Sequence, residues 1–126
     1  MIADGSLDFS LMYSRKYSLK TRYSFRNVLK SENSYSSKFL LIKYKRADFL
    51  KFGIITSNKF CKKATIQNKI RRYIAEAVTH NLSKFPQNYN FVFVPKKTVL
   101  FNDKVSVDAK EIDFEINTFL SKVVFT

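Results

Sequence analysis

The chain has 126 residues, 45% of them hydrophobic, and one cysteine, so it suits a single domain with its own core and excludes a disulfide framework. No apolar run approaches the roughly 18 residues of a membrane span, and a start with Asp4 and Asp8 is unlike a secretory signal. The net charge of +13 favours a polyanionic partner, above all nucleic acid. We expect a cytoplasmic protein without membrane association, with an irregular arm over residues 1–18 and one domain over 19–126.

The first half of this domain predicts one helix and two strands. Apolar spacing within 21–31 predicts a short helix. The segments 38–45 and 50–57 are rich in β-forming residues and predict strands. We expect these two strands to pair with each other across a short turn at Ala47 and Asp48.

The second half predicts two more helices and a third strand. Apolar residues spaced by three and four predict a long helix over 63–82, and the run YNFVFV predicts a strand over 89–94. Asp108, with Glu111 three residues later, predicts a final helix that starts with a capping box. The order α-β-β-α-β-α indicates an α+β fold, a small sandwich of helices against a sheet.

Positive charge is concentrated before and within the long helix. From Arg15 to Arg72 the chain has 17 basic and two acidic residues, a net charge of +15, whereas residues 73–126 have six of each. Cations in the first turns of a helix oppose its dipole, so a ligand explains them better than local stability does. The alternative is a merely soluble basic surface, for which a few units of charge suffice.

The long helix has a polar face suited to phosphates. On a helical wheel, the residues expected in solvent opposite the apolar stripe are Thr65, Asn68, Arg71, Arg72 and Ala75. Guanidinium forks and ammonium groups match phosphate oxygens. An asparagine amide can both donate to and accept from ribose and base edges. We therefore expect an RNA-binding face.

Aromatic residues are a second feature of interest. The sequence has seven Tyr and 13 Phe, most of which must form the core, but Phe25 lies between Arg22 and Arg26 in the first predicted helix. A ring beside arginine can stack on an unpaired RNA base. Burial, however, is the usual fate of phenylalanine. Both interpretations of Phe25 stay open at this point.

The residues offer little for catalysis by the protein itself. His80 is the one histidine of the sequence, and a role at the helix end is the better interpretation. Cys61 is not part of a Cys–His motif. The acidic residues within 103–115 suit a helix start better than a metal site. We therefore expect neither catalytic nor metal-binding residues in the protein.

The central run resembles the bacterial-type protein subunit of ribonuclease P. That family combines a glycine-containing strand, a lysine-rich loop and a helix that opens with Arg-Asn-Arg-x-Lys-Arg and continues with Arg-Glu. Here the run is Phe52-Gly-Ile-Ile-Thr-Ser-Asn-Lys-Phe-Cys-Lys-Lys-Ala-Thr-Ile-Gln-Asn-Lys-Ile-Arg-Arg72, then Ala75-Glu76. Matching or conservatively exchanged positions are Ala64, Asn68, Lys69, Ile70, Arg71, Arg72 and Glu76. Gln67 and Ala75 each replace an arginine, and Leu29 replaces a usual phenylalanine.

The resemblance, which covers about residues 19–124, implies a fold like the second domain of ribosomal protein S5, with a left-handed βαβ crossover. It implies a magnesium-dependent RNA subunit that removes the 5′ leader of precursor tRNA, with magnesium held mainly by that RNA and no obligatory protein partner. By position and neighbourhood, the expected catalytic-RNA contacts are Lys59, Lys62, Lys63, Asn68, Lys69, Arg71 and Arg72. The expected leader contacts are Arg22, Phe25 and Arg26.

The main hypothesis is therefore the protein subunit of ribonuclease P, which assists cleavage without performing the chemistry. The alternative is a structural ribosomal RNA-binding protein that uses the same basic face and has no role in cleavage. A third hypothesis, a self-sufficient nuclease, is disfavoured because Glu32 and Asp48 are the only carboxylates within the basic half.

Overall fold

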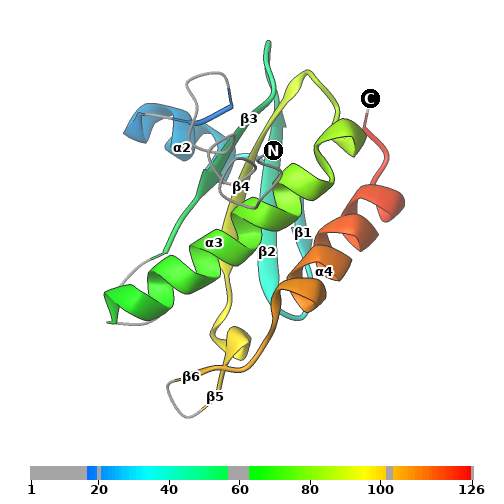
Figure 1. Ribbon diagram of the computed structural model, residues 1–126. Helices are drawn as coiled ribbons and strands as arrows, with labels where there is room; N and C mark the ends of the chain where they lie inside the picture. Colours follow the sequence, from blue (N-terminus) through cyan, green and yellow to red (C-terminus); the bar gives the residue numbers. More distant parts are fainter. Residues whose placement is uncertain (1–16, 20, 57–62, 102–103, 126) are drawn as a thin grey trace, which may run out of the picture.

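The computed structural model describes residues 17–19, 21–56, 63–101 and 104–125 (Figure 1). Within these residues the helices are α2 (Arg22–Leu29), α3 (Ala64–His80) and α4 (Ala109–Lys122), with short 3-10 turns η1 (Leu82–Lys84) and η2 (Lys97–Val99). The strands are β1 (Ser34–Ser36), β2 (Leu40–Arg46), β3 (Lys51–Ile54), β4 (Tyr89–Pro95), β5 (Leu100–Phe101) and β6 (Lys104–Val105). Each predicted helix and strand is present, whereas β1 and the small β5–β6 hairpin were not predicted.

The main sheet has the strand order β1-β2-β4-β3. Strand β4 is antiparallel to β2 and parallel to β3, and it separates the two. The prediction that the strands at 38–45 and 50–57 pair with each other is therefore wrong. The reason is the composition of β4: Phe91, Val92 and Phe93 are all fully buried, which requires cover on both faces and a central position.

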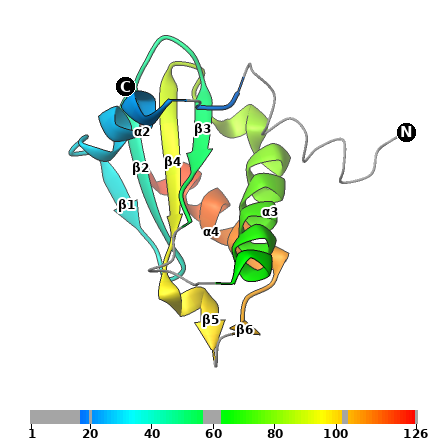
Figure 2. The ribbon, with the colours of Figure 1, turned by 90° about the vertical axis from the view of Figure 1, so that its left-hand side faces the viewer.

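Helices lie on both faces of this sheet (Figures 1 and 2). Phe91 and Phe93 point into the larger core, which α3 and α4 cover. Val92 points the other way and packs with Leu19 and Val28 beneath α2. In Figure 1, β3 and β4 both run downward, α3 crosses in front of them and β4 lies to the right of β3. The β3-α3-β4 crossover is therefore left-handed, against the usual right-handed rule, as the resemblance implied.

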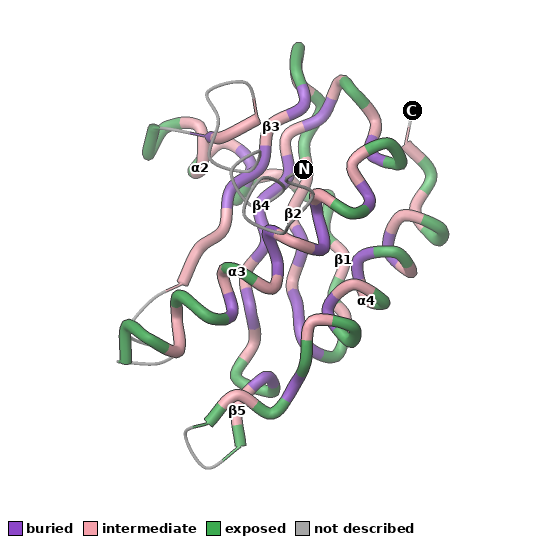
Figure 3. The backbone as a smooth tube through the Cα atoms, in the orientation of Figure 1, coloured by how far each residue is buried: buried purple, intermediate pink, exposed green. Residues whose placement is uncertain are grey.

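The two long helices form for different local reasons. Helix α3 buries the stripe Ile70, Ile74, Ala77 and Val78. It also buries Ala75 completely, so the expectation that this residue faces solvent is wrong. Helix α3 packs on α4 as well as on the sheet, which widens its buried face (Figure 3). Helix α4 starts with the predicted capping box between Asp108 and Glu111.

The segment before α2 lies along the outer edge of β3. The Leu19 N–H donates to the Phe52 carbonyl at 2.9 Å, and the Phe52 N–H donates to the Tyr17 carbonyl at 2.6 Å. Leu19 is buried beneath α2. These bonds fix the start of α2 relative to the strand that carries Gly53. No helix in the described part of the chain has the length and apolar character that a bilayer crossing requires.

Candidate nucleic-acid interface

The first two turns of α3 are a cationic surface. No residue from Lys63 to Lys69 is buried, and the helix extends past the sheet at this end (Figure 3). Lys63 is the N-cap, its side chain makes no capping hydrogen bond, and the first turn holds no acidic residue. Helices α2 and α4 both have side-chain caps, so α3 starts without the local stabilisation that the other two helices have.

The predicted polar face of α3 is partly confirmed. Thr65, Asn68 and Arg72 are exposed, as expected, and Lys69 is exposed with its Nζ 6.0 Å from the Tyr73 ring centroid. No described carboxylate lies within ion-pair distance of Lys63, Lys69 or Arg72; the ion pair between His80 and Asp113, at 3.8 Å, lies at the opposite end of α3. The charges on this face are therefore available to an external anion. The predicted Lys59 and Lys62 lie outside the described residues.

Arg71 differs from its neighbours. It is half-buried, whereas the helical wheel placed it in solvent. Its Nη2 donates to the hydroxyl of Thr56, which lies two residues beyond the end of β3. Its Nε is buried without a hydrogen-bond partner. A buried guanidinium nitrogen with no acceptor is costly unless a ligand or water completes it. Arg71 therefore lies between the α3 surface and the opposite face of the sheet.

On that opposite face, Phe25 lies directly over Gly53. A Cβ atom built at Gly53 would stand 2.2 Å from Phe25 Cε1, so the ring occupies the space that any other side chain would need. Phe25 is half-buried against Val28 and Val92, yet it also lines a cavity of about 200 Å³ together with Gly53 and Arg71. Both interpretations of Phe25 thus hold in part. Its role as a leader contact stays a prediction.

The two arginines that flank Phe25 in sequence are exposed. Arg22 and Arg26 lie in the first and last turns of α2. Thr21 caps this helix through its hydroxyl, which accepts from the Ser24 N–H at 3.0 Å. The cap fixes the start of the helix that carries Phe25 and both exposed arginines, although neither arginine lines the Phe25 cavity.

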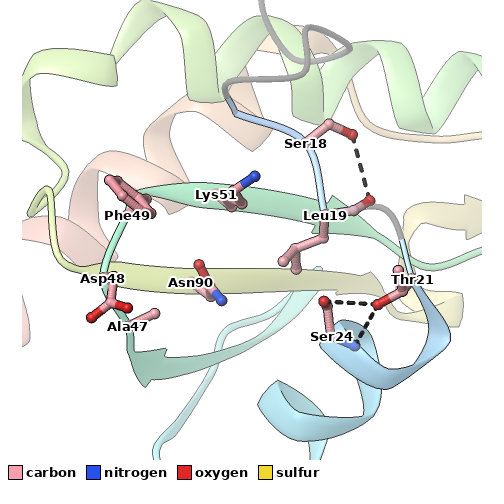
Figure 4. A pocket seen from close by; sticks show the side chains of 9 residues that line it. All are labelled: Ser18, Leu19, Thr21, Ser24, Ala47, Asp48, Phe49, Lys51 and Asn90. Atoms are coloured by element: carbon pink, nitrogen blue, oxygen red, sulfur yellow. Dashed lines mark hydrogen bonds between the residues drawn. The ribbon is translucent and has the colours of Figure 1, made fainter.

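A larger cavity, which the sequence did not reveal, adjoins the first (Figure 4). It has a volume of about 420 Å³ and lies between the start of α2 and the β2–β3 turn. Its walls include Phe49, Lys51 and Asn90. Ser18 and Leu19 line this cavity and also the one at Phe25. Side-chain alternation along β3 and β4 could have placed Lys51 and Asn90 next to each other on one face of the sheet, but only once β3 and β4 are known to be neighbours.

The described residues do not assemble a metal centre of their own. Nowhere in 17–19, 21–56, 63–101 and 104–125 do three or more His, Cys, Asp or Glu side chains gather in a way that could hold an ion. Near the start of α4, Glu115 instead accepts from the Ser37 hydroxyl and from the Phe39 N–H. Asp108 and Glu111 form the capping box. These carboxylates thus have structural partners.

Comparisons with known proteins agree on one family. A family model described as "Ribonuclease P" matches residues 13–123. The "Ribonuclease P protein component" of Petrotoga mobilis is 30% identical over 113 residues, which cover 88% of this chain and 94% of the relative. That of Clostridioides difficile is 33% identical, over 72% of this chain and 84% of the relative. The solved structure of the RNase P protein from Thermotoga maritima shares the fold, with a TM-score of 0.73 at 23% identity, over 86% and 98% of the two chains.

Proposed function

The chain belongs to the ribonuclease P protein family, and from this premise we propose how its residues divide between two RNA ligands. As the protein component of ribonuclease P, it works with an RNA partner in the maturation of tRNA 5′ ends. The finer proposal is that the cationic start of α3 binds the catalytic RNA. The face that carries α2 binds the leader of precursor tRNA.

The observation that carries this proposal is the unneutralised start of α3. Lys63, Asn68, Lys69 and Arg72 are exposed along the first half of a helix whose start has no side-chain cap and whose first turn has no acidic residue. Lysine and arginine attract phosphates there, and each phosphate neutralised releases counterions. Gln67, which replaces an arginine of the family signature, removes one such charge. The remaining cations support an RNA contact of the same kind with fewer charges.

The leader proposal rests on the opposite face. Phe25 offers part of an aromatic ring beside a cavity, and Arg22 and Arg26 lie exposed on the same helix. This combination suits a single strand whose bases stack and whose phosphates meet guanidinium groups. Leu29, at a position where the family has a second ring, is 37% exposed and can pack but not stack.

We propose further that the RNA subunit performs the cleavage and holds most of the magnesium, in the cytoplasm, and that no other protein is obligatory. The described residues show no fit to a magnesium site, so no step of the reaction is assigned to a protein-bound ion. The contribution of the protein is then positioning: one face holds the catalytic RNA and the other holds the leader. Such positioning lowers the entropic cost of bringing the two together.

Reconstitution tests this function. Adding the protein to a bacterial catalytic RNA should raise cleavage of precursor tRNA at low magnesium, because its cations replace part of the counterion screening. An unchanged rate would overturn the proposal. RNA that co-purifies with the protein separates the ribosomal alternative: ribosomal RNA would favour that alternative, and a catalytic RNA with tRNA precursors would favour ribonuclease P.

A further inference from the structure

We infer that the cavity between the start of α2 and the β2–β3 turn is a second stacking site for the leader, with Phe49 as its aromatic platform. This inference rests on the function proposed above and adds a binding residue to it. Phe49 lies in the turn, outside both strands, and its side chain is 70% exposed. Exposure alone does not mark a binding residue, since Phe114 on α4 is 69% exposed, so the inference rests on where the Phe49 ring stands.

The position of Phe49 connects it with the face that carries α2. It lines the 420 Å³ cavity together with Thr21 and Ser24 at the start of that helix (Figure 4). It also lines a second hollow of about 400 Å³ with Tyr17 and Gln87. The side chain thus stands between two open spaces, so a planar group can approach it without rearrangement of the core.

The two cavities form a path that a single strand can follow. Ser18 and Leu19 are walls of both the Phe49 cavity and the smaller Phe25 cavity. One ring therefore stands at each cavity, and the same two residues lie between them. A chain of unpaired nucleotides can stack one base at each ring, because stacking depends on the π-face that every base has.

The polar groups around Phe49 favour a base rather than a phosphate in this cavity. Its walls combine Lys51 with the carboxylate of Asp48, so the charge there is mixed. The Thr21 hydroxyl already accepts from the Ser24 N–H, so this donor at the start of α2 is not available to an anion. The Asn90 amide also lines the cavity, and its buried Oδ1 has no hydrogen-bond partner. Carboxylate and amide groups suit the edge of a nucleobase, which presents both donors and acceptors.

The test uses the reconstituted holoenzyme and precursor tRNAs whose leaders range from one to about ten nucleotides. For the wild-type protein, affinity should increase as the leader lengthens. Phe49→Ala should reduce that gain at least about fivefold, the lower end of what one stacked base contributes. Phe49→Tyr should restore it, whereas Phe49→Leu should not. The matched control is Phe114→Ala, because Phe114 is 69% exposed but lies on α4, across the sheet.

The outcomes separate this inference from the proposed function. If the wild-type protein does not stimulate cleavage at all, the proposed function fails and the inference falls with it. If it does stimulate cleavage and Phe49→Ala keeps the full gain with leader length, the inference alone is overturned. Equal losses with one-nucleotide and long leaders would also overturn it, because they would place Phe49 in the fold or at the catalytic RNA. Circular dichroism should give the same spectrum for Phe49→Ala and the wild type.

Discussion

The contact between Phe25 and Gly53 is the most testable packing feature of the leader face. In Gly53→Ala the new Cβ would lie 2.2 Å from Phe25 Cε1 and 2.5 Å from Cζ, well inside the 3.4 Å at which ordinary contact starts. The ring would have to retreat by about 1.2 Å, the difference between 2.2 and 3.4 Å. Because Phe25 is half-buried, it can move outward, but it would then lose contact with Val92 beneath it.

The magnitude follows from two opposing effects. Overpacking of this kind costs about 1–3 kcal/mol. Replacing a glycine in a strand with alanine stabilises the folded state by about 0.5–1 kcal/mol, because glycine loses more conformational freedom on folding. These ranges leave a net cost of about 0–2.5 kcal/mol. Because the new Cβ would stand only 2.2 Å from the ring, we expect Gly53→Ala to be destabilised by about 1–2 kcal/mol, or about 4–8 °C in Tm for a chain of this length. Affinity for a long-leader precursor should fall about tenfold, as for Phe25→Ala, because the ring no longer stands where a base would stack.

A double-mutant cycle isolates the cause. With Phe25→Ala in the background, the new methyl group has open space, so adding Gly53→Ala should cost nothing further in stability or leader affinity. Thermal unfolding by circular dichroism and binding of long- and short-leader precursors to the holoenzyme measure both quantities. Gly53→Ala with wild-type Tm and affinity would refute the reasoning, as would losses in the double variant equal to the sum of the single ones.

Arg72→Ala should weaken catalytic-RNA binding and make the slope of log affinity against log salt concentration shallower by roughly one unit. Lys122→Ala, at an exposed position of α4, should do neither. A titration of affinity against salt measures this, and an unchanged slope would place Arg72 away from RNA. Asp108→Ala should lower the free energy of unfolding by about 1 kcal/mol without affecting RNA binding, because it removes the 2.9 Å bond from the Glu111 N–H; urea unfolding checks this. Burial raises the pKa of Tyr44 above its ordinary 10.0, so the unfolded chain loses this proton first and stability falls as pH rises beyond 10.0. Tyr44→Phe should flatten that decline in unfolding experiments at pH 8–11, and an equally steep decline would contradict it.

Local patterns predicted the elements but not their neighbours. The apolar stripe of α3 and the capping box of α4 depend on residues three or four apart, and both were found at the expected positions. Strand pairing depends on which elements cover each face. Strands β2 and β3 follow each other in the sequence and were therefore predicted to pair as a hairpin, whereas each pairs with β4. The continuous apolar run of β4 already indicated a strand buried on both faces.

The site was predictable to a similar extent. The helical wheel correctly predicted that Thr65, Asn68 and Arg72 are exposed. The wheel failed for Ala75, because it assumes one buried face while α3 packs against two neighbours. It also could not show that Arg71 reaches Thr56, since that contact depends on where β3 ends. The cavity at Phe49 needs the whole tertiary arrangement.

The position of β4 has a consequence for how this chain folds during synthesis. Strand β4 is the last strand of the main sheet to leave the ribosome, and it joins β3 to the earlier pair β1–β2. Until residues 89–95 emerge, β3 has no neighbouring strand except the short contact with segment 17–19. The most basic stretch of the polypeptide is therefore released before the sheet beneath it can close, and the late, long-range pairing sets the pace of folding.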